Sequence, residues 1–129
     1  MHQLPQISEA EYEIMKILWA EHPLSTNDIC KRAQQTHDWN QKTIHTLLSR
    51  LYNKGVVAYE KKGRMYHYDP LIAREEYLRQ ENRHFLGRFY EGKAAPMLSA
   101  LLSNADISDQ ELKEMYDLLE AKIKKGGDA

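Results

Sequence analysis

The sequence has almost no cysteine and few of the residues that build linkers. Cys30 is the only cysteine among 129 residues, so no disulfide can form within the chain, as is typical of a reducing compartment. Four prolines and six glycines leave no room for a low-complexity linker. No apolar run approaches the roughly 20 residues of a membrane span, and the first residues lack the layout of a signal peptide. We therefore expect a cytoplasmic protein without membrane insertion.

The chain also lacks the motifs of a metal site or of an enzyme. Its histidines show no close metal-ligand spacing, and Cys30 has no second cysteine near it. The sequence contains neither a nucleophile-and-base motif nor a glycine-rich phosphate loop. We expect no metal, no cofactor and no enzymatic activity.

An excess of positive charge is missing as well, which by itself argues against a nucleic-acid partner. The 18 Lys and Arg residues are balanced by 19 Asp and Glu residues, for a formal net charge of −1. The distribution is uneven, however. Residues 39–68 carry six basic residues against Glu60 alone, a net charge of +5, whereas residues 1–38 and 71–129 carry −3 and −2. The central segment is therefore predicted to bind phosphates in a salt-dependent way.

The patterns that are present predict three helices, a β-hairpin and three further helices. The first helices are expected over residues 8–20, 25–36 and 40–54, each opening on a good capping residue (Ser8, Ser25 and Asn40). Strands are expected over residues 56–61 and 65–68 around a turn at 62–64, and the last helices over 71–91, 94–102 and 107–125. Gly55 is expected to end the third helix in the left-handed conformation.

This order of elements predicts a mainly α fold with a small β-hairpin. Three helices followed by a hairpin are the layout of a winged helix-turn-helix domain, which we expect over residues 1–70. The helical segment 71–129 has roughly 60 residues, a length that is marginal for an isolated fold. Its apolar stripes must therefore pack on the first domain or on the same segment of a second chain.

The predicted third helix has two faces of opposite character. Its apolar face repeats at i, i+3, i+4 and i+7 (Ile44, Leu47, Leu48 and Leu51), and the other face carries Lys42, His45, Thr46, Ser49 and Asn53, with Thr43 and Arg50 at the border. Basic side chains neutralise phosphates or pair with guanine, and hydroxyl and amide groups bond to phosphates or base edges. An ordinary solvated helix would show the same pattern. The neighbouring hairpin with Lys61, Lys62 and Arg64 favours DNA contact by both elements.

The aromatic residues near this segment are expected to serve mainly in packing. Trp19 and Trp39 are predicted to lie in the core or at the domain edge. Four tyrosines surround the hairpin, Tyr52, Tyr59, Tyr66 and Tyr68, and we expect them to pack on the strands. The alternative for this group is a hydroxyl that reaches a phosphate.

Two long motifs resemble the penicillinase/methicillin-resistance repressor family (BlaI/MecI type). They are ISEAEYEIMKILW at residues 7–19 and WNQKTIHTLLSRLYNKG at residues 39–55. The resemblance continues through the hairpin to Phe89-Tyr90-x-Gly92 and more loosely to the end. It implies a homodimeric transcriptional repressor of β-lactamase-like resistance genes that binds an inverted-repeat operator. The motif positions imply DNA contacts by Lys42, Thr43, His45, Thr46 and Arg50, supported by the hairpin. Ser49, on the polar face of the same predicted helix, is also expected to contact DNA.

The resemblance further implies that the last three helices form the dimer interface. Its expected residues are Leu78, Phe85, Phe89, Leu98, Leu101, Leu102, Leu112, Met115 and Leu119. In the best-known systems of the family, a membrane β-lactam sensor with a zinc-protease domain triggers cleavage within these helices. The corresponding place here is Ala100-Leu101, where typical repressors have Asn-Phe, and His45 stands where Arg is common. The Cys-x-Cys motifs of the copper-responsive branch are absent, which argues against copper sensing of that kind.

Two other functions fit the same pattern of elements. One is a winged-helix regulator that senses a small ligand in a pocket between the winged-helix domain and the C-terminal helices. The other is a winged helix that serves as a protein-interaction module. In the second case, replacing Lys42, Thr46 and Arg50 by Ala would leave activity unchanged.

Overall fold

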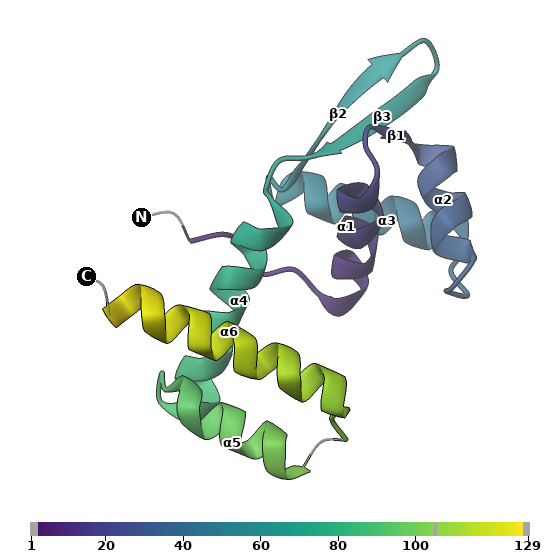
Figure 1. Cartoon of the computed structure of the whole chain (residues 1–129). Coiled ribbons are helices and arrows are strands. Elements are labelled where there is room, and N and C mark those ends of the chain that lie inside the picture. The colour runs from purple at the N-terminus through teal and green to yellow at the C-terminus, as the bar shows by residue number, and fades with distance from the viewer. Residues whose placement is uncertain (1–2, 105, 128–129) are drawn as a thin grey trace. The chain divides into compact units, whose positions relative to one another are not determined.

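The computed structural model describes residues 3–104 and 106–127 and divides into two compact units, Met1–Asn82 and Arg83–Ala129 (Figure 1). Unit 1 contains α1 (Glu9–Ala20), β1 (Leu24–Ser25), α2 (Thr26–Gln34), α3 (Gln41–Asn53), β2 (Val57–Lys62) and β3 (Met65–Pro70). Helix α4 (Arg74–Tyr90) contributes residues to both units, and unit 2 also contains α5 (Ala94–Asn104) and α6 (Asp109–Gly127). The predicted order of helices and hairpin is confirmed.

The helices of unit 1 begin at the predicted capping residues. The Ser8 side chain accepts from Glu11 N (3.1 Å), and Glu11 Oε1 accepts from Ser8 N (2.6 Å), which completes a capping box. The Ser25 and Asn40 side chains cap α2 and α3 by accepting from Asp28 N and Thr43 N, respectively. Each side-chain oxygen satisfies an N–H group that the first helical turn leaves without a partner, so these local signals fix where the helices start.

The hairpin is longer than predicted and belongs to a three-stranded antiparallel sheet in the order β1-β3-β2. Lys62, expected in the turn, pairs with Met65, so the turn contains only Gly63 and Arg64. Gly63 has φ +65°, which glycine adopts without strain at the first position of a two-residue hairpin turn. Strand β1 was not predicted; its two residues pair with β3 at the base of the hairpin.

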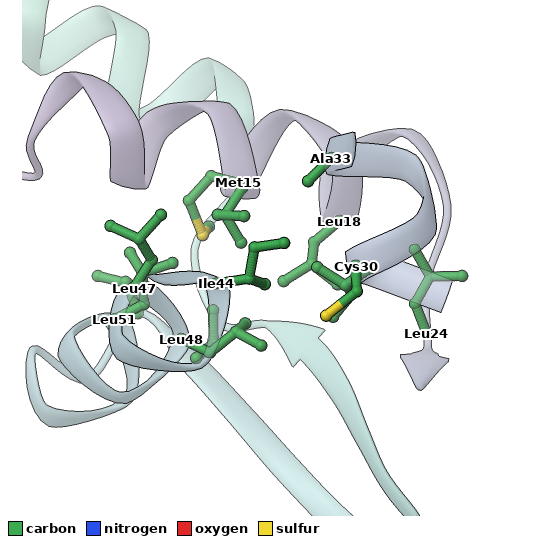
Figure 2. Close-up of a cluster of buried hydrophobic side chains, with 13 residues drawn as sticks. Met15, Leu18, Leu24, Cys30, Ala33, Ile44, Leu47, Leu48 and Leu51 are labelled. Carbon is green, nitrogen blue, oxygen red and sulfur yellow. The ribbon is translucent and has the colours of Figure 1, made fainter. Parts of the chain in front are cut away.

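A core of thirteen buried residues joins the three helices of unit 1 to the sheet. Figure 2 shows Met15 of α1 in one cluster with Ile44 and Leu47 of α3. All four residues of the predicted apolar face of α3 are buried. Burying such a side chain contributes about 1.5–3 kcal/mol, so the core turns one face of α3 inward and leaves the opposite face to solvent.

The first two turns of α4 bond to the N-terminal part of unit 1. The side-chain amide of Gln80 donates to Leu4 O (2.8 Å) and accepts from Leu4 N (2.7 Å). The centroid of the Tyr77 ring lies 6.1 Å from that of Tyr12 and 6.3 Å from that of Trp19. Just before α4, Ile72 O accepts a hydrogen bond from Trp19 Nε1 (2.9 Å). The residues up to Asn82 therefore pack with the winged-helix elements, and the boundary expected after residue 70 stays a prediction.

Unit 2 has no buried core of its own among the residues that the structure describes. None of residues 83–104 and 106–126 is buried. Large apolar side chains are exposed instead, among them Phe85, Phe89, Leu101, Leu102, Leu112 and Leu119 of the predicted dimer interface; Leu98 and Met115 are half-buried, and Leu78 is half-buried in unit 1. No helix within the described residues is both long enough and apolar enough to cross a membrane.

Candidate nucleic-acid interface

The solvent-exposed side of α3 carries a continuous set of polar side chains, here called the contact face. It lines an open groove of about 490 Å³ and consists of Gln41, Lys42, His45, Thr46, Ser49, Arg50 and Asn53. The structure thus brings together five of the six α3 residues predicted to contact DNA. Thr43, the sixth, is exposed but does not line this groove, and its N–H donates to the Asn40 side chain at 2.8 Å.

The chemistry of the contact face suits a negatively charged ligand with hydrogen-bonding edges. From Asn40 to Ala58 the chain has no acidic residue, so no carboxylate of α3 repels phosphate. The Thr46 hydroxyl donates to Lys42 O (3.0 Å), so it faces a ligand as an acceptor or through its methyl group. Lys42, Arg50 and His45 supply donors, a combination that reads base edges and neutralises phosphates.

The wing, defined here as β2, β3 and their turn, extends beyond the helices of unit 1 (Figure 1). The residues predicted to contact DNA from it, Lys61, Lys62 and Arg64, are all exposed near its tip. Because side chains alternate along a strand, Lys61 and Lys62 lie on opposite faces of the sheet. Lys61 shares its face with Tyr66, and its Nζ lies 5.8 Å from the centre of that ring.

Among the basic wing residues predicted to contact DNA, Arg64 shares a hollow with residues of α3. It lines a hollow of about 240 Å³, here called the Arg64 hollow, together with Thr26 and Asn27 of α2, Gln41 and His45 of α3, and Met65 and Tyr66 of β3. Sequence analysis did not assign Thr26, Asn27, Gln41 or Met65 to the site. Gln41 could have been found, because it shares the helical face of His45 and Ser49 at a spacing of four residues. Thr26 and Asn27 reach the site only through the folding of α2 against the wing.

The net charge of +5 that the sequence assigns to residues 39–68 overstates the positive charge on this surface, because Lys54 is paired inside the fold. Lys54 is one of the six basic residues of the +5 segment, but its Nζ donates to Glu11 Oε1 (2.6 Å) and Gln6 O (3.0 Å). The Glu11 side chain is only 1% exposed, whereas that of Lys54 is 34% exposed. One positive charge is therefore directed into the fold, where it neutralises a buried carboxylate instead of meeting phosphate.

This ion pair also fixes the end of α3. Burial alone raises the pKa of the Glu11 carboxyl, but hydrogen bonds from Lys54 and Ser8 and the charge of Lys54 outweigh it, so the pKa lies below its ordinary value. Beyond Lys54, Gly55 N donates to Tyr52 O and Val56 N to Leu51 O, with Gly55 at φ +78° as predicted. These bonds anchor the C-terminal end of α3 to α1 and to the start of β2.

Comparison with known proteins gives a consistent result. A sequence model described as penicillinase repressor matches residues 7–121. A penicillinase repressor of Bacillus licheniformis is 39% identical over 120 residues, covering 93% of this chain and 94% of that protein. A methicillin resistance regulatory protein MecI of Staphylococcus aureus strain N315 is 31% identical over 117 residues, covering 91% and 95%.

Two solved structures of a BlaI repressor match more than half of this chain. The solution structure of the DNA-binding domain of the repressor BlaI is 42% identical, with a TM-score of 0.54, and covers 60% of this chain and 94% of that domain. The Bacillus licheniformis BlaI monomeric form in complex with the blaP half-operator is also 42% identical, with a TM-score of 0.53 and the same coverage. These similarities confirm the predicted winged-helix fold. With nearly its whole length matched, the chain belongs to the penicillinase repressor family.

Proposed function

We propose that this protein is a DNA-binding transcriptional repressor of antibiotic-resistance genes and not an enzyme. Its contact face enters the major groove of an operator half-site, and its wing lies along the adjacent backbone. The observation that carries the proposal is the acid-free contact face, which the core of unit 1 holds toward solvent beside Arg64. The similar BlaI domain solved with a half-operator supports it. Such a repressor acts on DNA, so we propose that it works in the cytoplasm.

A gel shift with the inverted repeat of the gene's own promoter tests this function. We expect a specific complex that weakens steeply with salt, because Lys42 and Arg50 displace counterions from phosphates. A triple Ala variant of Lys42, Thr46 and Arg50 should lose the complex, since phosphate and base contacts disappear together. Lys113→Ala, at an exposed position of α6, is the matched control and should bind as the wild type. An undiminished shift with the triple variant would show that DNA binds through another surface. Absence of a specific, salt-sensitive shift with the wild type would favour a protein-interaction module.

We also propose that unit 2 forms a homodimer, because its apolar side chains lack a core within the described chain. Leu118 and Ile123 are exposed beside the predicted interface residues of α6. A two-fold dimer would place two contact faces about one DNA turn apart, or a multiple of it, as an inverted repeat requires. Light scattering after gel filtration should give twice the chain mass of 15.1 kDa for the wild type. Leu119→Asp should give a monomer that binds a half-site but loses the affinity gained from two half-sites.

Release from DNA by proteolysis of the C-terminal helices belongs to the same proposal. Ala100 and Leu101, the expected cleavage region, lie within α5, and both line a hollow with Phe85 and Met97. A cut there would separate α6 from the rest of the proposed interface. A recognition sequence for a site-specific protease inserted between Ala100 and Leu101 tests this consequence: after cutting, both the dimer and the tight operator complex should be lost. A membrane sensor pathway would supply the natural protease.

A further inference from the structure

A second hollow lies between α3 and the wing, and its walls are mostly tyrosine. This tyrosine hollow has a volume of about 260 Å³ and is lined by Ser49, Tyr52, Asn53, Tyr59, Tyr66 and Tyr68. Tyr66 also lines the Arg64 hollow, so the two hollows adjoin along the cleft between helix and wing. Ser49 and Asn53 belong to the contact face as well. The tyrosine hollow is therefore continuous with the surface proposed to bind DNA.

Packing alone does not account for these tyrosines. Tyr68 is half-buried and packs against the core, but Tyr52, Tyr59 and Tyr66 remain 41–46% exposed. The Tyr59 ring lies at the centre of the group, 4.8 Å from Tyr52 and 5.0 Å from Tyr66 between ring centroids. Contact with two neighbours holds the Tyr59 ring in place. The result is an ordered aromatic surface that still faces solvent, a feature typical of binding sites.

The hollow offers hydrogen-bond donors without a negative charge. Four tyrosines, Ser49 and Asn53 line it, and no acidic residue lines either hollow. Glu60 lies on the opposite face of β2 from Tyr59 because side chains alternate along the strand. Lys61 lies over the Tyr66 ring, and Arg64 lines the adjoining hollow. Neutral donors surrounded by positive charge match the oxygen atoms of a phosphodiester.

The hydroxyl groups also divide into two roles. The charge effect of Tyr52 and partial burial raise the pKa of Tyr59, and a hydrogen bond with Tyr52 acts in the same direction. A raised pKa favours the neutral phenol of Tyr59. The Tyr59 ring also packs on the Tyr52 ring at 4.8 Å between centroids, which limits the positions open to Tyr52. Tyr59 is thus a positioning residue for Tyr52.

The size of the hollow favours an extended anionic chain over an enclosed small organic ligand. Pockets for small organic ligands measure about 300–1,000 Å³ and enclose most of the ligand, whereas the two hollows measure about 260 and 240 Å³ and are open. An extended chain of small anionic units fits two adjoining shallow hollows better than a single enclosed molecule does. The DNA backbone has this form, and the contact face directs it to this place.

We propose that the cleft between α3 and the wing binds the sugar–phosphate backbone of one DNA strand, with the Tyr52 and Tyr66 hydroxyls donating to phosphate oxygens. The inference rests on the proposed DNA-binding function. It adds uncharged contacts that hold the backbone between the major groove occupied by α3 and the wing. Lys61 and Arg64 attract the strand, and the tyrosines fix its position.

Binding of the full-length protein to a fluorescent random-sequence duplex of about 20 base pairs tests this proposal, because backbone contacts need no operator. Tyr52→Phe and Tyr66→Phe keep the rings and remove one hydroxyl each, and each should weaken binding about tenfold, the worth of a hydrogen bond to a charged group. The slope of log affinity against log salt should stay that of the wild type, because a neutral donor displaces no counterion. Tyr59→Phe should weaken binding less, through Tyr52.

The control is Tyr116→Phe in α6, where the tyrosine is 64% exposed and lies outside unit 1. It should bind as the wild type. If the wild type binds the duplex and both Tyr52→Phe and Tyr66→Phe bind it with an affinity within twofold of the wild type, this proposal is overturned and the proposed function stays intact. Weakening accompanied by a flatter salt slope would also overturn it, because the hydroxyls would then act through Lys61. Absence of salt-dependent binding by the wild type would instead overturn the proposed function itself.

Discussion

Replacing Lys54 by Met separates the two uses of positive charge in unit 1. Methionine retains an apolar stem of similar length, so the change removes mainly the ammonium group. Glu11, 1% exposed, would keep only the bond from Ser8 N and would remain a buried charge without its cation. Breaking a buried pair from one side costs about 3–5 kcal/mol. Since Lys54 is 34% exposed, we expect the lower end, about 3 kcal/mol of unfolding free energy, and a Tm lower by roughly 10 °C.

Urea unfolding followed by tryptophan fluorescence measures this effect in unit 1, because Trp19 and Trp39 are the only tryptophans. All variants are compared at one protein concentration, since dimerisation would shift the midpoint. Glu11→Gln alone should cost about 1 kcal/mol, because the amide still accepts from Ser8 N. The double variant, Glu11→Gln with Lys54→Met, should be more stable than Lys54→Met alone, because no buried charge remains. The difference between its loss of unfolding free energy and the sum of the two single losses gives the interaction free energy of the Glu11–Lys54 pair.

The same variant makes a prediction for DNA. Lys54 neutralises Glu11 and meets no phosphate, so Lys54→Met should retain the wild-type salt slope of DNA binding. Lys42→Met is the matched control on the contact face: it should lower the slope by about 0.9 per half-site and change the unfolding free energy by less than about 0.5 kcal/mol. If Lys54→Met unfolded like the wild type and flattened the salt slope, Lys54 would be a phosphate ligand and the argument would be wrong.

Three further predictions concern the supports of the contact face. Asn40→Ala should cost about 1 kcal/mol in urea unfolding because Thr43 N loses its cap, and Asn40→Ser should restore most of it; equal stability of all three proteins would contradict the cap. Gln80→Ala should raise the amide exchange rate of Leu4, which loses both of its bonds to that side chain; an unchanged rate would show that α4 does not hold this segment. The low pKa of the Glu11 carboxyl in the folded state should stabilise the fold at pH values above 4.5, the ordinary pKa, and this stabilisation should be lost as the pH falls through the lower folded pKa. Urea titrations from pH 7 to pH 3 should show this extra acid sensitivity in the wild type and not in Glu11→Gln.

Features encoded by neighbouring residues were predictable from the sequence. Ser8 with Glu11 marks the start of a helix because the bonds form within four residues, and Gly55 marks an end because its backbone permits positive φ. The apolar spacing of Ile44 to Leu51 identified the buried side of α3, and the contact face followed as its opposite. Periodicity alone therefore oriented α3.

Features that depend on distant partners were not predictable. Strand β1 has two residues, too few for an alternating pattern, and exists because β3 provides a pairing edge. The inward direction of Lys54 depends on Glu11, 43 positions earlier, so charge counting assigned this residue to the DNA surface. Thr26 and Asn27 join the Arg64 hollow through tertiary packing. The exposure of Tyr52, Tyr59 and Tyr66 likewise follows from how α3 meets the sheet.

The base of the wing is fastened at several points, whereas its tip has only the two-residue turn. Ser25 both pairs with His67 and caps α2, and Leu71 N donates to Val56 O, so the strand register is set from the base. Extra residue pairs added at Gly63-Arg64 would lengthen the hairpin without altering that register. The reach of the wing along DNA can therefore diverge among descendants of this sequence independently of the core, and the same position is the natural place for an engineer to graft a longer loop.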